Sequence, residues 1–285
     1  MLTMPYDPTR ESLFHPGKAD DFFQHGPISS DAALCAEMAR LAYVKETAHL
    51  TQYLARACFA LTVPIGYQTS GAQAFIATST AGPNPVVVVA FRGTEAEDPS
   101  DLFTDAKFAF TPWTVDGKVL GNVHDGFEAS FRSIFPTDGD LRSKFKGSER
   151  VLITGHSLGA ALATLATSVF PPGHLYTFGS PLVGNEAFRR SMHDVDHGRY
   201  VDCCDLVTRV PPEFLGYVHV GARHYIDRHG SVLSAPSDDA IKGDRREASL
   251  AYLFEYSFRR GTVPVRELAD HTPVNYVSAV MGLRP

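Results

Sequence analysis

The sequence predicts an α/β fold in which a mainly parallel central sheet is covered by helices on both faces. Every residue of the run Val86–Phe91 is apolar, and a strand with two apolar faces belongs in a sheet that has helices on each side. Short strand and helix patterns alternate between residues 151 and 204, which favours parallel strands joined by right-handed crossovers. A chain of 285 residues, 44% of them hydrophobic, is long enough to bury one large core.

The N-terminal region is expected to be an irregular arm that precedes a single domain. Residues 1–28 mix Pro, Gly, Asp and Phe without a period, which is typical of a segment without regular structure. Ser30 and Asp31 then open an amphipathic helix that runs to Tyr43, and a second helical pattern covers residues 46–61. No internal repeat or long linker divides residues 29–285, so we expect one domain there.

The remaining elements follow from the period of the apolar residues and from the turn residues between them. We expect strands at 65–69, 74–79, 86–91, 151–154, 175–178 and 199–204, an alternating segment at 217–226 and a loop at 230–243. We expect helices at 125–145 with a break at 136–139, and at 158–169, 185–192, 245–258 and 274–281.

Charge and hydropathy exclude several classes of protein. With 26 Lys and Arg against 32 Asp and Glu, the net charge of −6 gives no basic surface for nucleic acid. The longest apolar run, residues 85–91, is much shorter than the roughly 18 residues that a membrane span needs. Residues 1–8 lack the basic and apolar regions of a signal peptide. A cytoplasmic location is therefore the default expectation, and secretion stays open in case a leader was trimmed.

The cysteines and histidines do not indicate a metal site or any other cofactor. The 4 Cys and 12 His are not arranged at metal-ligand spacings. Pairing between Cys35 and Cys58 is left open by the sequence, whereas a bond between the adjacent Cys203 and Cys204 would be strained. The oligomeric state is also left open.

Residues 155–159, Gly-His-Ser-Leu-Gly, form a Gly-x-Ser-x-Gly motif between an expected strand and a helix of small residues. This is the context of a nucleophile elbow, a sharp turn that exposes the serine above the carboxyl edge of the sheet. Gly155 and Gly159 satisfy the need for small residues where helix and strand approach each other. We expect the adjacent His156 to point away from Ser157 and to pack or form hydrogen bonds beneath the elbow.

A serine nucleophile needs an imidazole base and a carboxylate that orients the base. On this architecture the acid and then the base follow the serine in the chain. Of the seven histidines after Ser157, His271 lies in a loop before the last helix, where it can reach over the elbow. Asp205 directly follows the strand at 199–204, at the edge where such sheets gather their ligands. Spacing alone fits a loop-capping carboxylate at Asp205 equally well.

With these residues in place, the sequence resembles the class 3 lipase family, the α/β-hydrolases typified by filamentous-fungal triacylglycerol lipases. Six ordered motifs carry the resemblance between about residue 35 and residue 277. They are residues 91–94 (Phe-Arg-Gly-Thr), 123–127 (Val-His-Asp-Gly-Phe), 155–159, 177–181 (Thr-Phe-Gly-Ser-Pro) with 184–185, 205–207 with 211–212, and 270–271 (Asp-His). The resemblance implies that Ser157 is the nucleophile, Asp205 the acid and His271 the base. It also implies an oxyanion hole formed by Thr94 and the amide of Leu158.

The resemblance places a lid segment at about residues 95–120. Residues 95–105 hold five acidic and no basic residues, which predicts that anionic interfaces are poor substrates. Asp105 matches a family aspartate that would orient the Thr94 hydroxyl. The candidate lid and groove-rim residues are Leu102, Phe103, Phe108, Phe110 and Trp113. The aromatic residues from Phe108 onward are equally consistent with a place in the core.

The expected activity is ester hydrolysis through an acyl-enzyme. A lipase that acts on neutral acylglycerols is the favoured reading, so the expected partners are an ester or lipid substrate and, transiently, a lipid interface. A non-interfacial carboxylesterase, a phospholipase A1 and a feruloyl-type esterase are the alternatives within hydrolases. A non-catalytic lipid-binding relative is the remote alternative.

Overall fold

The structure is a computed structural model that describes residues 3–25, 28–66, 72–82, 84–94, 108–145, 150–170 and 173–284. Its main sheet contains eight strands. In spatial order they are β1 (Phe59–Gly66), β2 (Gln73–Ser79), β3 (Val86–Phe91), β6 (Arg150–His156), β7 (His174–Phe178), β8 (His197–Asp202), β9 (Ala222–Ile226) and β10 (Val232–Ser234). The five strands from β3 to β9 are parallel, and β1, β2 and β10 pair antiparallel at the edges. This confirms the predicted α/β class.

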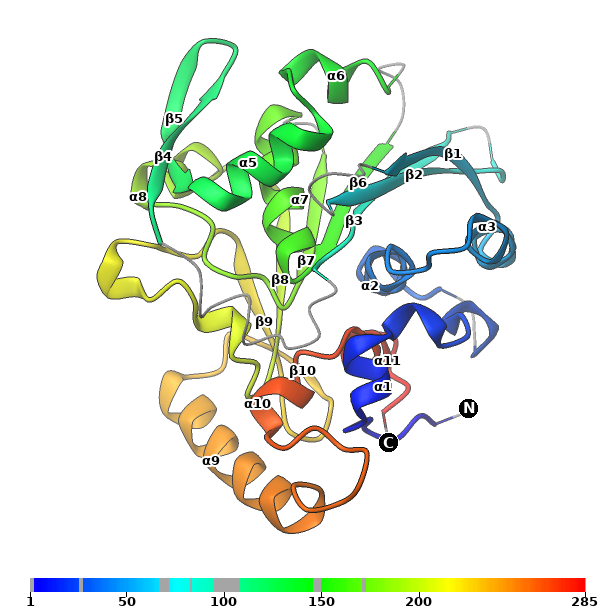
Figure 1. Cartoon of the computed structure of the whole chain (residues 1–285), viewed down its shortest axis with the longest axis vertical. Helices are drawn as coiled ribbons and strands as arrows, with labels where there is room; N and C mark the ends of the chain where they lie inside the picture. Colours follow the sequence, from blue (N-terminus) through cyan, green and yellow to red (C-terminus); the bar gives the residue numbers. More distant parts are fainter. Residues whose placement is uncertain are drawn as a thin grey trace.

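Helices lie on both faces of this sheet (Figure 1). The α-helices are α1 (Arg10–Phe14), α2 (Asp31–Leu41), α3 (Thr47–Arg56), α5 (Asp125–Ile134), α6 (Asp138–Arg142), α7 (Leu158–Val169), α8 (Glu186–Ser191), α9 (Asp238–Glu255), α10 (Arg266–Ala269) and α11 (Pro273–Val280). The 3-10 helices are η1 (Pro16–Lys18), η2 (Phe22–His25), η3 (Val207–Arg209) and η4 (Glu213–Leu215). In the described part of the chain, no helix is long and apolar enough to cross a membrane.

The two faces of the sheet contribute to two hydrophobic cores. Along β3, Val88 joins the core that includes α2 and α11, whereas its neighbours Val87 and Val89 join the core that includes α7. Side chains of a strand alternate between faces, so an all-apolar strand fills both cores. The apolar run at residues 86–91, from which the covered sheet was predicted, therefore forms an inner strand of that sheet.

The first strand begins earlier than the sequence predicts. Helix α3 ends at Arg56 and β1 starts at Phe59, where the apolar period indicated a helix to residue 61 and a strand at 65–69. Cys58 has a φ of +59°, which ends the helix. Residues 59–66 then gain backbone partners from β2, starting with Phe59 opposite Ser79.

A hairpin of β4 (Phe110–Val115) and β5 (Lys118–His124) occupies part of the predicted lid range. Its turn residues Asp116 and Gly117 both have positive φ, 49° and 75°. An Asp-Gly pair between two strands is a strong hairpin signal, and the sequence analysis did not use it. The rest of the predicted lid, residues 95–107 with Leu102, Phe103 and Asp105, lies outside the described residues.

Trp113 lies in the core, so its predicted place on a substrate rim is wrong. Its side chain has no exposed surface, its Nε1 donates to Ser168 Oγ at 2.8 Å, and its ring meets Phe131 edge-on with centroids 5.5 Å apart. A buried indole needs both apolar contacts and a hydrogen-bond partner. Helix α5 supplies the apolar contact, and helix α7 supplies the hydrogen-bond partner.

Two segments predicted to be irregular contain regular elements. The arm includes α1, η1 and η2, and Phe22 and Phe23 are buried in the core beside α2. Helix α9 begins at Asp238 inside the predicted loop, because Ser237 caps it by accepting a hydrogen bond from the amide of Ala240.

Candidate active site

Ser157 lies on a strained turn between β6 and α7. Its φ and ψ are 59° and −128°, a conformation that is costly for a residue with a side chain. A Cβ atom at Gly155 would lie 2.2 Å from the carbonyl oxygen of Gly159, and one at Gly159 would lie 2.2 Å from that of Phe91. Strand, turn and neighbouring strand therefore approach so closely that both motif positions require glycine.

Asp205 and His271 form a buried hydrogen-bonded pair. His271 Nδ1 lies 2.9 Å and 3.1 Å from the two carboxylate oxygens of Asp205. Asp205 has no exposed surface, and His271 is 3% exposed. Since a carboxylate only accepts, Nδ1 carries the hydrogen and Nε2 is left to accept a proton.

Two further donors hold the Asp205 carboxylate in place. The amide of Val207 donates to Oδ1 at 2.8 Å, and the Tyr276 hydroxyl donates to Oδ2 at 2.6 Å. Each hydrogen bond to a charged acceptor stabilises the ionised form. Burial and the Asp205 charge in turn raise the pKa of Tyr276 well above its usual range. Tyr276 is therefore a neutral, permanent donor, and the sequence analysis did not identify it.

Several loops converge beside the turn that carries Ser157. A Cβ atom at Gly93 would lie 3.1 Å from Ser157 Cβ, so the segment after β3 passes directly over the serine. Gly179, after β7, has a φ of +60°, and a Cβ there would lie 2.9 Å from the Asp205 carboxylate and 3.1 Å from His271 Nδ1. The loops after β3, β6, β7 and β8 thus meet at the carboxyl edge of the sheet.

His156 lies beneath the elbow and joins it to the base. Its ring centroid is 4.5 Å from that of His271, its Nε2 is 2.8 Å from the His271 carbonyl oxygen, and its Nδ1 is 2.9 Å from the Tyr43 hydroxyl. Burial, and secondarily the nearby His271, lowers the pKa of His156 well below its usual range. The neutral ring donates from Nε2 to the carbonyl, and the Tyr43 hydroxyl donates to Nδ1.

The predicted oxyanion residues lie next to this centre. Leu158 is the first residue of α7, where helix amides and the helix dipole favour negative charge. Thr94 follows β3 and Gly93 and has an exposed side chain. Phe108 is half-buried and meets the ring of His124 edge-on at 6.2 Å, and its role at a substrate rim stays a prediction.

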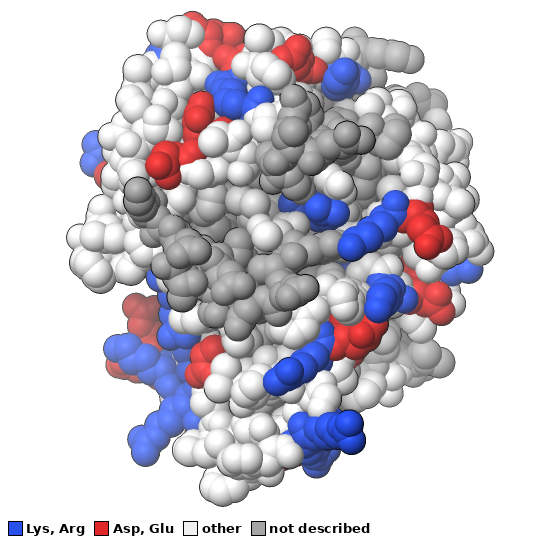
Figure 2. All heavy atoms as spheres, viewed as in Figure 1, with Lys and Arg blue, Asp and Glu red and all other residues white. Residues whose placement is uncertain are grey.

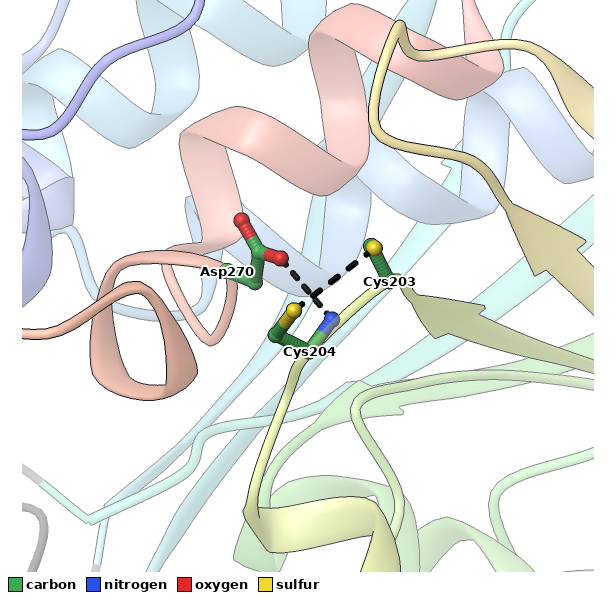
Figure 3. Close-up of side chains that lie close together, drawn as sticks. All are labelled: Cys203, Cys204 and Asp270. Atoms are coloured by element: carbon green, nitrogen blue, oxygen red, sulfur yellow. Dashed lines mark hydrogen bonds between the residues drawn. The ribbon is translucent and has the colours of Figure 1, made fainter. Parts of the chain in front are cut away.

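The residues that precede the acid and the base are joined to each other. Figure 3 shows Cys203, Cys204 and Asp270 close together, with the amide of Cys204 donating to Asp270 Oδ2 at 2.9 Å. Arg266 Nε donates to both oxygens of Asp270, at 3.2 Å and 3.1 Å, and the Tyr6 hydroxyl donates to Oδ1 at 2.7 Å. We call Asp270, Cys204, Arg266 and Tyr6 the Asp270 network. Its members are distant in sequence, so no spacing pattern indicated it.

Ligand atoms of Cys203, Cys204 and Asp270 lie within 4.8 Å of one another. The Asp270 carboxylate, however, already accepts from Arg266, and Cys203 Sγ donates to Asp244 Oδ2 at 3.2 Å. Hydrogen bonding to Cys204 and burial raise the pKa of the Cys203 thiol, whereas a metal requires the thiolate. The cluster is thus built as a hydrogen-bond network. All four cysteines, including Cys35 and Cys58, are free thiols.

Comparison with known proteins relates this chain to fungal lipases. A family model for class 3 lipases matches residues 88–215, a range that includes Ser157 and Asp205. A secreted mono- and diacylglycerol lipase of Penicillium cyclopium is 32% identical over 187 residues, which cover 59% of this chain and 59% of that protein. One of Malassezia restricta is 29% identical over 224 residues, covering 73% of this chain and 64% of that protein. The match spans less than two thirds of either relative.

The fold is also found among solved structures. A lipase from Rhizopus microsporus var. chinensis superposes with a TM-score of 0.53 at 27% identity, over 79% of this chain and 76% of that chain.

The comparisons contradict the predicted cytoplasmic location. Both fungal relatives are secreted proteins by name. The prediction had relied on the lack of a signal-peptide pattern in residues 1–8, which is a weaker observation than the location of matched relatives. Over residues 88–215 the chain is therefore similar to the class 3 lipase family, and it shares its fold with fungal lipases.

Proposed function

We propose that this chain is a serine ester hydrolase that cleaves acylglycerols through an acyl-enzyme. The observation that carries the proposal is the buried hydrogen bond from His271 to Asp205, 2.9 Å long, beside the strained turn of Ser157. A base that is oriented by a carboxylate and lies beside a serine on a sharp turn is the arrangement of acyl-transfer enzymes on several unrelated folds. The names of the fungal relatives favour mono- and diacylglycerols as substrates.

In the proposed reaction, Ser157 Oγ attacks the ester carbonyl carbon while His271 Nε2 takes the hydroxyl proton. Asp205 stabilises the imidazolium that forms. The tetrahedral intermediate collapses as His271 returns the proton to the leaving alcohol, and the acyl group stays on Ser157. Water, deprotonated by the same imidazole, then attacks the acyl-enzyme, and a fatty acid is released.

The negative charge of the tetrahedral oxygen requires donors that are already in place. We assign this role to the Leu158 amide at the start of α7 and to Thr94, with each donor lowering the barrier by about 3 kcal/mol. His156 acts indirectly, because its hydrogen bond to the His271 carbonyl holds the backbone of the base.

The experiment is hydrolysis of p-nitrophenyl esters and of tributyrin by wild type and Ser157→Ala. The variant should lose turnover on both substrates, while its circular dichroism and thermal unfolding match those of wild type. Retained turnover in Ser157→Ala would overturn the assignment of the nucleophile.

The same assay separates the alternatives. A rate increase above the solubility limit of tributyrin supports a lipase, and its absence supports a non-interfacial carboxylesterase. Release of fatty acid from phosphatidylcholine at the sn-1 position would favour a phospholipase A1, and release of ferulate from a feruloyl ester would favour a feruloyl-type esterase.

We further propose that the protein is secreted, as its fungal relatives are by name. Detection of the protein in the culture medium of its source, with a cytoplasmic marker absent from the medium, supports secretion. Retention of the protein with the cytoplasmic marker would contradict it.

A further inference from the structure

Helix α9 ends in a group of strongly exposed apolar side chains. Phe254 and Phe258 are 85% and 88% exposed, and Leu250 and Leu253 are 49% and 43% exposed. Leu250, Leu253 and Phe254 lie three and four residues apart, so they share one side of the helix, and Phe258 follows in the turn after it. We call these four residues the α9 surface.

The opposite side of α9 already fastens the helix to the protein. Ile241, Ala248 and Tyr252 are buried, and the Tyr252 hydroxyl donates to the carbonyl of Val263 at 2.7 Å. The α9 surface is therefore not needed to hold the helix in place. A phenylalanine as exposed as Phe254 or Phe258 leaves a large apolar area in water that a partner can cover.

Helix α9 is hydrogen-bonded to the segments that directly precede the proposed acid and base. Arg245 Nε donates to the carbonyl of Cys203, two residues before Asp205, at 2.7 Å. Ser249 Oγ donates to Glu267, four residues before His271, at 3.1 Å. Figure 1 shows α9 beside α10 at the lower end of the molecule. The α9 surface is thus tied to the same end of the sheet as the candidate active site.

Cationic side chains stand directly beside the α9 surface. Arg259 and Arg260 follow Phe258 and are exposed, and Arg246 is exposed one turn before Leu250. Glu247 and Glu255 are the acidic residues between Arg246 and Arg260, and Glu247 is paired with Arg228, so the arginines outnumber the free carboxylates beside the α9 surface. In Figure 2, an uncharged area at the lower edge of the molecule has Lys and Arg side chains on both sides. Guanidinium groups bind phosphate oxygens with paired hydrogen bonds.

We propose that the α9 surface docks the protein on a phospholipid surface, with the two phenylalanines inserted among the acyl chains and the arginines on the phosphate groups. The proposal rests on the proposed function in one respect, because a hydrolase of acylglycerols must reach aggregated lipid. A second copy of the chain fits less well. In a two-fold dimer the same patch meets itself, and Arg259 and Arg260 would face their own copies.

The experiment measures binding and hydrolysis separately, since the acidic residues at 95–105 are expected to slow turnover on anionic lipid. Wild type, Phe254→Ser/Phe258→Ser and Arg259→Gln/Arg260→Gln are sedimented with phosphatidylcholine vesicles, with and without phosphatidylglycerol. The matched control is Lys144→Gln/Leu233→Ser, which removes an exposed cation after α6 and an exposed apolar side chain on β10, both outside the α9 surface and outside the predicted lid. Each variant is also assayed on soluble p-nitrophenyl acetate.

The phenylalanine variant should bind both kinds of vesicle at least about tenfold more weakly. The arginine variant should bind anionic vesicles about tenfold more weakly than wild type at low salt, and its affinity for phosphatidylcholine vesicles should change little. The control should bind as wild type does, and all variants should hydrolyse the soluble ester equally. Unchanged vesicle binding by the phenylalanine variant would overturn the proposal. So would a wild-type dimer that this substitution converts to a monomer, because the occupant would then be a second copy. Failure of the proposed function would instead appear as no hydrolysis of any ester by wild type.

Discussion

Gly159 shows how a single residue fixes the position of the candidate nucleophile. A Cβ atom there would lie 2.2 Å from the carbonyl oxygen of Phe91, which is far inside contact distance. The start of α7 can therefore approach β3 only because residue 159 has no side chain. We assign the oxyanion hole to the Leu158 amide and Thr94, and the distance between these two residues depends on this approach.

Gly159→Ala is expected to lower the free energy of unfolding by about 2 kcal/mol, because the backbone must move to remove the overlap. It should also lower kcat on p-nitrophenyl butyrate. The matched control is Gly243→Ala, since residue 243 is helical with open space around its Cα and alanine favours the helix by about 0.5–1 kcal/mol. Urea unfolding of both variants measures the effect, and a Gly159→Ala protein as stable as wild type would contradict the close approach.

At the scale of elements, the Asp270 network links three parts of the chain that are far apart in sequence. Asp270, the residue before the base, accepts a hydrogen bond from the amide of Cys204, the residue before the acid. Asp270 also accepts a hydrogen bond from Tyr6, which lies in the N-terminal arm. The geometry of the acid and the base thus depends on contacts outside both loops. Arg266 supplies the charge that balances the buried carboxylate.

Asp270→Asn is expected to destabilise the fold by about 3 kcal/mol, because it leaves the buried Arg266 without its carboxylate. It should also lower kcat/KM on soluble esters. Glu186→Gln is the control, since that carboxylate pairs with Arg189 and Arg190 on an exposed face of α8, where little change in stability is expected. Thermal unfolding and steady-state kinetics report both effects. If the two variants had the same thermal stability and the same kcat/KM, the Asp270 network would not be needed to position the acid and the base.

Particular elements explain how much the sequence could predict. The run at 86–91 and the strand at 151–154 are apolar on both faces, so their period alone placed them in the middle of a covered sheet. Ser157, Asp205 and His271 follow a fixed chain order, so their pairing could be proposed before any geometry was known. The β4–β5 hairpin carried a local signal, Asp116-Gly117, that the sequence analysis did not use. Tyr276 and Tyr6 carried none, because only the folded chain brings them to the acid and to Asp270.

For the whole molecule, acid should be destabilising because several histidines, among them His156 and His197, are buried without charge. Burial lowers the pKa of His197 to about 3 and holds the pKa of His156 well below its usual range. The unfolded chain binds a proton at each position below about pH 6.5, whereas the folded protein does not. Stability is therefore fully present above that pH and is lost as the pH falls, by about 1.4 kcal/mol per unit for each histidine.

His197→Gln should therefore lose less stability than wild type between pH 7.5 and pH 5.5, by about 1.4 kcal/mol. Urea unfolding at the two pH values measures this difference. Equal losses of stability in the two proteins would contradict the neutral, buried state of His197.

The same unfolding curves test the prediction that residues 29–285 form one domain. A single transition would support this prediction, and two separated transitions would count against it.

The central claim is that Ser157 is a nucleophile activated by His271, and covalent labelling tests it most directly. A fluorophosphonate reacts with a serine only where a base removes the hydroxyl proton and the phosphoryl oxygen is stabilised. Mass spectrometry of the labelled protein should find one adduct, on the peptide that contains Ser157, and labelling should be lost in both Ser157→Ala and His271→Ala. An adduct on another residue, or undiminished labelling of either variant, would contradict the account.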